Sequence, residues 1–266
     1  MIFGFIGSGN MGGAIIGGII NSDIASPENV IVSDKNEQAL KNINEEYGVK
    51  VTSDNKETAD KADVLFLCVK PQFLYGVIDE IKNSVSDNTV IVSIVAGQAI
   101  ETIEKAFEHN IKLVRVMPNT PALVGEGMAA LTPNSNVTKE ETDVVVNVFN
   151  SFGKGEVVSE NLMDAVTAVS GSSPAYVFMM IEAMADAAVI GGMPRSQAYT
   201  FAAQAVLGSA KMVLETGKHP GELKDMVCSP AGTTIDAVAI LEKDGFRNIE
   251  FFEMHLNNSI DKNVEL

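Results

Sequence analysis

A glycine-rich stretch near the start of the chain has the spacing of a site for a phosphorylated ligand. Gly7-Ser8-Gly9-Asn10-Met11-Gly12 fits the pattern G-x-G-x-x-G and directly follows the apolar residues 2–6. In this pattern the first glycine permits a tight turn, the second lets the backbone approach a pyrophosphate, and the third allows helix to pack closely on strand. The helix that begins here offers unpaired N–H groups and a positive dipole end to phosphates. The alternative is a glycine-rich turn with a structural role only.

An acidic residue stands where this motif requires a group that binds the ribose. Asp34 follows the second apolar run, residues 30–32. Its carboxylate can accept hydrogen bonds from the ribose hydroxyls of NAD, and it would repel the additional phosphate of NADP. Asp34 could equally cap the helix that follows. Lys35 keeps NADP possible through charge attraction, so the sequence leaves the cofactor preference open.

Three further loops follow predicted strands at the end where an open parallel sheet binds its ligand. They are Val69–Gln72, Val95–Gln98 and Met117–Pro121. Lys70 is a candidate charged partner for cofactor or substrate, and a solvated lysine at a strand end is the alternative. Asn119 lies between prolines on a stiffened loop, which suits a polar group held near a nicotinamide, although an ordinary turn would have the same composition.

A fourth polar cluster lies far along the chain, in Cys228–Thr234. Small residues, Gly232 and the hydroxyls of Thr233 and Thr234 open a predicted amphipathic helix. Such a helix start can form a nest for a carboxylate. A hydroxyl there could instead be the N-cap, and the two roles are compatible.

Other kinds of site lack their signatures in this sequence. It has no C-x-x-C pair and no H-E-x-x-H pattern, so no metal site is predicted. It has no G-x-S-x-G elbow, which argues against a hydrolase of that type.

The elements that must hold these loops divide the chain near residue 160. Before that point, short branched apolar runs alternate with helical patterns, which predicts parallel strands with right-handed crossovers. We therefore expect an α/β fold, with a Rossmann-type, doubly wound sheet over residues 1–160. The predicted strands cover residues 2–6, 30–32, 64–69, 89–95 and 112–117, and residues 128–131 and 155–158 could extend the sheet.

An all-α region for substrate binding and dimerisation is predicted over residues 161–266. Residues 174–214 carry only four charges, and Gly191–Pro194 separates two long helices. A helix that is apolar almost all round must be buried on several sides, and a region of this size has little core of its own. We therefore expect a second copy of the chain to cover these helices, as a homodimer or a multiple of it.

Composition narrows the class of partner and the compartment. The chain of 266 residues has 35 acidic against 19 basic residues, a formal charge of −16, which argues against nucleic acid and anionic membranes. Two cysteines suit a reducing cytoplasm. Residues 1–22 are uncharged, yet they contain seven glycines and no basic segment precedes them, so we expect a buried strand and helix, not a membrane span.

Taken together, these motifs resemble pyrroline-5-carboxylate reductase. The resemblance rests on Gly7–Gly12, Val69–Pro71, Met117–Pro121, Ser170–Tyr176 and Asp225–Thr234, and it extends in order from residue 1 to about residue 250. The last of these motifs is the specific one. The resemblance implies reduction of 1-pyrroline-5-carboxylate to L-proline with NADPH or NADH, the final step of proline synthesis.

The resemblance also implies roles for single residues. Cofactor contacts would fall on Gly7, Ser8, Gly9, Asn10, Met11, Gly12, Asn55, Lys70, Pro71, Ala96, Gly97 and Asn119, beside Asp34. The loop with Ser229, Gly232, Thr233 and Thr234 would hold the substrate carboxylate and ring nitrogen, with Thr234 a candidate proton donor, and Glu160 would approach the ligand. Many relatives carry a small or basic residue in place of Asp34 and favour NADPH, so this position departs from the family.

This chemistry agrees with the residues available. A protonated cyclic imine accepts a hydride readily, so the enzyme needs orientation and a weak proton donor. A β-hydroxyacid dehydrogenase is the nearer rival, but those enzymes use a lysine early in the second domain, and none occurs between Lys154 and Lys211. A non-catalytic nucleotide sensor would not need the second polar loop. The resemblance further implies that this loop completes its site across a dimer interface.

Overall fold

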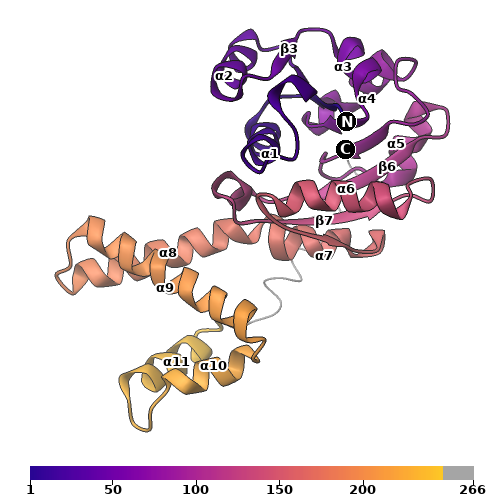
Figure 1. Cartoon of the computed structure of the whole chain (residues 1–266). Helices are drawn as coiled ribbons and strands as arrows, with labels where there is room; N and C mark the ends of the chain where they lie inside the picture. The colour runs from indigo at the N-terminus through magenta and orange to yellow at the C-terminus, as the bar shows by residue number, and fades with distance from the viewer. Residues whose placement is uncertain (248–266) are drawn as a thin grey trace. The chain divides into compact units, whose positions relative to one another are not determined.

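Eight strands form one sheet that carries the loops predicted to bind a dinucleotide. The computed structural model of the chain describes residues 1–247. The strand order is β3-β2-β1-β4-β5-β6-β7-β8, and all neighbours are parallel except β6 and β7. Figure 1 draws this part of the chain in indigo to magenta. The strands are β1 (Phe3–Ile6), β2 (Val30–Ser33), β3 (Lys50–Thr52), β4 (Val64–Leu67), β5 (Val90–Ser93), β6 (Lys112–Met117), β7 (Gly127–Pro133) and β8 (Gly153–Val157). The predicted Rossmann-type sheet is thus confirmed.

Helices follow the strands in the order that parallel crossovers require. They are α1 (Asn10–Asn21), α2 (Glu37–Tyr47), α3 (Asn55–Lys61), α4 (Pro71–Ile81), α5 (Ile100–Phe107) and α6 (Lys139–Asn150). The sequence patterns missed β3 and α3. Strand β3 has only three residues, all at least partly exposed at the sheet edge, so it lacks the apolar run that marks the other strands.

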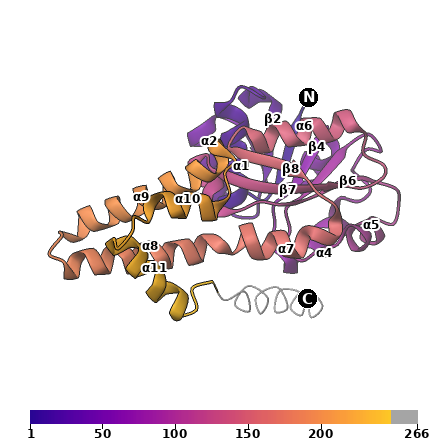
Figure 2. The same cartoon turned by 90° about the horizontal axis from the view of Figure 1, so that it is seen from below.

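The alternation of side chains along each strand builds a core on both faces of the sheet. Phe3 and Phe5 of β1 pack with α1, α2 and α6, whereas Ile6 packs with α4 and α5 on the opposite face (Figure 2). Phe5 and Phe66 are register partners on β1 and β4, and their rings stack with centroids 4.6 Å apart. Full burial of each such ring contributes about 1.5–3 kcal/mol, so these strands fix where the loops after them begin.

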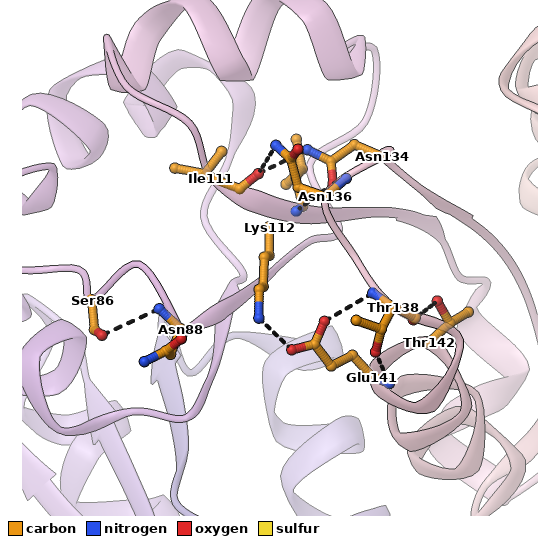
Figure 3. A network of polar contacts seen from close by, with 10 residues as sticks. Ser86, Asn88, Ile111, Lys112, Asn134, Asn136, Thr138, Glu141 and Thr142 are labelled. Atoms are coloured by element: carbon orange, nitrogen blue, oxygen red, sulfur yellow. Dashed lines mark hydrogen bonds and ion pairs between the residues drawn. The ribbon is translucent and has the colours of Figure 1, made fainter.

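A polar network holds the amino end of β6, far along the strand from the loops after its carboxyl end. Lys112 Nζ lies 2.6 Å from Glu141 Oε1, and Glu141 also forms a capping box with Thr138 at the start of α6 (Figure 3). The side chains of Asn134 and Asn136 both donate to the Ile111 carbonyl oxygen. This network secures the β6–β7 connection and the helix that follows it.

A helical segment follows the last strand and still belongs to the first compact unit. It comprises η3 (Glu160–Leu162), α7 (Met163–Val166) and the π-helical turn η4 (Thr167–Gly171). Met163 and Ala168 are buried. The described residues accordingly divide into compact units at Ser172. The domain boundary expected at residue 160 stays a prediction, and residues 248–266 of the second expected domain lie outside the described residues.

The second unit is helical, and its side chains bury little against one another. It contains α8 (Ser173–Ile190), α9 (Arg195–Thr216), α10 (Pro220–Val227) and α11 (Thr233–Lys243). Helices α8 and α9 form the predicted pair, separated by a turn in which Gly192 has a φ of +95° (Figure 1). Within residues 173–247, the buried hydrophobic residues are only alanines: Ala185, Ala198 and Ala202.

Large apolar side chains of this unit are exposed instead. They include Phe178, Met179, Ile190, Phe201, Leu207 and Leu214. Among the described residues, one helical stretch, Glu160–Ile190, is long and apolar enough to cross a membrane by length and composition, and only 6% of its most apolar window is buried. Such a face needs a covering partner, because monomers seldom leave a large contiguous apolar patch exposed.

Candidate active site

The glycine loop after β1 has the backbone that a pyrophosphate site requires. Gly7 has a φ of +103°, a conformation that favours glycine, and its N–H donates to the Ser33 carbonyl oxygen at 2.8 Å. A Cβ on Gly12 would lie only 2.5 Å from the Gly7 carbonyl oxygen, whereas a Cβ on Gly9 would meet no atom within 4 Å. As the motif predicts, Gly7 makes the tight turn, Gly9 leaves open space for a ligand, and Gly12 allows close packing.

The start of α1 is free to bind an anion. Gly9 is the N-cap, no side chain caps the helix, and its first turn holds no acidic residue. The first N–H groups of a helix have no partner within it, and the helix dipole adds positive potential there. The residues present thus fit the phosphates of a nicotinamide dinucleotide.

Asp34 connects the second strand to this loop. Its Oδ2 lies 2.7 Å from the backbone N of Ser8 and 2.8 Å from Ser8 Oγ, and its Oδ1 lies 2.9 Å from the backbone N of Asn36. The alternative role as cap of α2 is wrong, because β2 ends at Ser33 and Asn36 is the N-cap, accepting from the N–H groups of Gln38 and Ala39. The carboxylate is therefore fixed beside the glycine loop.

The loops after β4 and β5 place further candidate residues at the same end of the sheet. Lys70 is the N-cap of α4 and is exposed, and Pro71 is the first helical residue. Gly97 turns the loop after β5 with a φ of +74°, next to the exposed Ala96. Tyr75 Oη donates to Gln98 Oε1 at 2.5 Å, which ties α4 to this loop. No sequence motif indicates this pair.

Two asparagines expected at the cofactor have side chains occupied by other partners. Asn55 is buried, and its amide accepts from Ser33 Oγ at 2.8 Å and donates to Glu80 at 2.9 Å. The Asn119 amide donates to the Ser170 carbonyl oxygen at 3.0 Å and accepts from the Met128 N–H at 2.8 Å. Both therefore hold segments around the site in place, and their contact with a cofactor stays a prediction.

Glu160 is also engaged within the first unit. Its Oε1 accepts from Arg115 Nη1 at 2.9 Å and from the backbone N–H of Ile100 at 2.8 Å. The contact that the resemblance implies between Glu160 and substrate stays a prediction. The sequence patterns did not indicate this ion pair, although one cation inside the apolar run of β6 is a signal that it pairs with an acidic side chain.

The Ser229–Thr234 loop lies in the helical unit and leads into α11. The Gly232 N–H donates to the Ser229 carbonyl oxygen at 3.1 Å, and Ala231 between them has a φ of +55°, which a residue with a Cβ seldom adopts. Gly232 is the N-cap, so the expectation that a threonine caps this helix is wrong. The first N–H groups of α11 and the hydroxyls of Thr233 and Thr234 are left available for a ligand.

The part of the chain that the structure describes holds no cluster of side chains suited to a metal ion. Residues 1–247 contain no group of three or more metal-ligating side chains. Cys68 and Cys228 are both free thiols, and burial strongly raises the pKa of Cys68.

Two family models match the chain, one on each side of its middle. Residues 2–97 match the NADP oxidoreductase, coenzyme F420-dependent, family, and residues 160–266 match the pyrroline-5-carboxylate reductase dimerisation family. A relative from Escherichia coli (strain K12), named pyrroline-5-carboxylate reductase, is 53% identical over 244 residues, which are 92% of this chain and 91% of its own. A relative of the same name from Methanosarcina acetivorans is 48% identical over 244 residues, 92% of this chain and 90% of its own.

Solved structures of similar proteins cover both units. A pyrroline-5-carboxylate reductase from Coxiella burnetii superposes with a TM-score of 0.90 at 34% identity, covering 99% of this chain and 97% of its own. A pyrroline carboxylate reductase from Plasmodium falciparum, solved with NADP bound, gives a TM-score of 0.86 at 33% identity with the same coverage.

Proposed function

The chain belongs to the pyrroline-5-carboxylate reductase family, and from this premise we propose that it reduces 1-pyrroline-5-carboxylate to L-proline with NADH or NADPH. The observation that carries the proposal is the 53% identity, over 92% of the chain, to an enzyme of that name. Two uncapped helix starts, in α1 and α11, agree with it, because the reaction needs one anion site for a dinucleotide and one for a carboxylate.

The first unit binds the cofactor. The N–H groups at the start of α1 hold the pyrophosphate, and Gly9 leaves room for it. Lys70 contributes an exposed positive charge for the cofactor or substrate. When bound, NADH or NADPH would supply the hydride that adds to the imine carbon, and the dinucleotide would be released in its oxidised form. This unit thus fixes the donor side of the reaction.

The Ser229–Thr234 loop binds the substrate. The N–H groups of α11 and the hydroxyls of Ser229 and Thr233 receive the substrate carboxylate, since a helix start stabilises an anion. As the imine carbon is reduced, the electron pair of the C=N bond passes to the ring nitrogen, which must carry a proton. The Thr234 hydroxyl donates or positions that proton, and water restores it afterwards.

The enzyme acts as a homodimer or a larger homo-oligomer built through its helical unit. The support is the exposed apolar face of α8 and α9 together with the match of residues 160–266 to a dimerisation family. That match supports a protein partner for the apolar stretch Glu160–Ile190. We assign the enzyme to the cytoplasm, where its two free thiols stay reduced, and we expect neither nucleic acid nor membrane as a partner.

A direct assay tests the proposed reaction. Purified enzyme is mixed with 1-pyrroline-5-carboxylate and either NADH or NADPH, with the loss of absorbance of the reduced cofactor and the formation of proline measured side by side. We expect both signals in equal amounts. Cofactor oxidation without proline, or no oxidation with either dinucleotide, would contradict the proposal.

A further inference from the structure

The carboxylate of Asp34 is held by three donors from two loops. Its Oδ2 accepts from the Ser8 N–H and the Ser8 hydroxyl, and its Oδ1 accepts from the Asn36 N–H. Partial burial by itself would raise the pKa of Asp34, but these hydrogen bonds outweigh it and lower the pKa, so the side chain is an anion at neutral pH. No cationic side chain contributes to this effect. The charge is therefore stabilised by dipoles alone.

Only one of the three donors to Asp34 is a side-chain group that a substitution can remove. The Ser8 and Asn36 N–H groups belong to the backbone and would remain with other side chains at these positions. The Ser8 hydroxyl, 2.8 Å from Oδ2, depends on the side chain. A carboxylate has about four acceptor positions, so three are occupied before any ligand arrives. The remaining capacity cannot serve both hydroxyls of a ribose.

We propose that Ser8 tunes the cofactor preference, because its hydroxyl occupies Asp34 and so weakens the bias of this carboxylate toward NADH. Asp34 stands after the second strand, the position from which a carboxylate of this fold contacts the ribose and repels a 2′-phosphate. A hydroxyl donor on Oδ2 removes an acceptor position and disperses negative charge. The proposal rests on the dinucleotide site proposed above, and not on the imine substrate.

Equilibrium titration of the full-length protein with NADH and with NADPH, followed by fluorescence without substrate, tests this role. For Ser8→Ala we expect the ratio Kd(NADPH)/Kd(NADH) to rise about fivefold, the net effect of one hydrogen bond. Ser8→Thr retains a hydroxyl and should keep the wild-type ratio. Ser22→Ala is the matched control, because the Ser22 hydroxyl bonds to the Gly18 carbonyl oxygen at the far end of α1 and should not affect the ratio.

The Ser8→Ala substitution is also tested in the Asp34→Ser variant. This comparison separates an effect of Ser8 that acts through Asp34 from a general effect on the glycine loop. Asp34→Ser should lower the ratio, and Ser8→Ala added to Asp34→Ser should change it no further. An unchanged or lower ratio in Ser8→Ala, or the same rise in the Asp34→Ser background, would overturn the proposal. Because these titrations contain no imine, they test the role of Ser8 separately from the reductase activity. A failure of the reductase assay therefore would not change their outcome.

Discussion

The carboxylate of Glu160 pairs with Arg115 and at the same time fixes the start of α5. Its Oε1 lies 2.9 Å from Arg115 Nη1 and 2.8 Å from the Ile100 backbone N. The Arg115 side chain is only 14% exposed. A partly buried guanidinium left without its partner costs more than the pair itself contributes. Glu160 therefore secures the point at which the chain leaves the sheet for the helical unit.

We expect Glu160→Gln to reduce stability by about 1–2 kcal/mol, because it leaves Arg115 without a counter-charge. The thermal midpoint should fall while the KM for the imine stays close to the wild-type value. Glu156→Gln on exposed β8 is the control. A large rise in KM with an unchanged midpoint would instead show that Glu160 contacts the substrate.

The ion pair at the amino end of β6 predicts a loss of stability in acid. Burial by itself raises the pKa of Glu141, but hydrogen bonds from Lys112 and Thr138 outweigh it, and the pKa lies below its ordinary 4.5. Because the pKa is lowered in the folded state, the stabilisation is present above about pH 4.5 and is lost as the pH falls through the folded-state value. Glu141→Gln should therefore lower the thermal midpoint more at pH 7 than at pH 3.

The neighbouring Glu140 gives a control for the Glu141 experiment. It lies in the same first turn of α6 and is exposed. Glu140→Gln should shift the midpoint little at either pH. If Glu141→Gln were as destabilising at pH 3 as at pH 7, the ionised carboxylate could not be the source of the stabilisation.

Removal of the Thr234 hydroxyl should slow the reaction. We expect Thr234→Ala to lower kcat/KM by about 10- to 1000-fold, the effect of losing a positioned donor. Thr234→Ser should recover most of the activity, because it restores a hydroxyl. Thr216→Ala at the end of α9 is the control for a threonine away from this loop. Wild-type kinetics in a well-folded Thr234→Ala enzyme would exclude a role of the Thr234 hydroxyl in both substrate binding and proton transfer.

Complementation tests whether two chains share each site. Gly9→Trp places a ring in the open space beside α1 and should block the dinucleotide without disturbing the core. Co-refolded with Thr234→Ala, it should regain activity in mixed dimers, where one chain supplies an intact glycine loop and the other an intact Thr234. Each variant refolded alone gives the baseline. No gain in verified mixed dimers, or an active monomer, would contradict a shared site.

The sequence predicted the glycine loop because its constraints are local. Gly7 needs a left-handed turn, and Gly12 faces a carbonyl oxygen only five residues away, so adjacent positions determine both. The buried strands were equally predictable from their branched apolar runs. The cap of α2 was harder, since Asp34 and Asn36 are both good capping residues and only the end of β2 decides between them.

Side-chain partners from distant segments could not be predicted in this way. The amide of Asn119 bonds to the Ser170 carbonyl oxygen, 51 residues along the chain, and Glu160 bonds to Arg115, 45 residues away. A polar residue at a strand end indicates a site, but the residues that pack against it decide whether its side chain remains free for a ligand.

Among residues 173–247 the helical unit buries only alanines, so the concentration of the protein sets the stability of this unit. Ala185, Ala198 and Ala202 bury too little surface to hold four helices together by themselves. Folding and association of this unit are then a single event, governed by mass action. Every tenfold dilution of a dimer shifts that balance by about 1.4 kcal/mol toward separate chains. In a cell that makes little of this protein, a larger fraction of the chains would therefore be dissociated. The activity of each chain would then fall together with the number of chains.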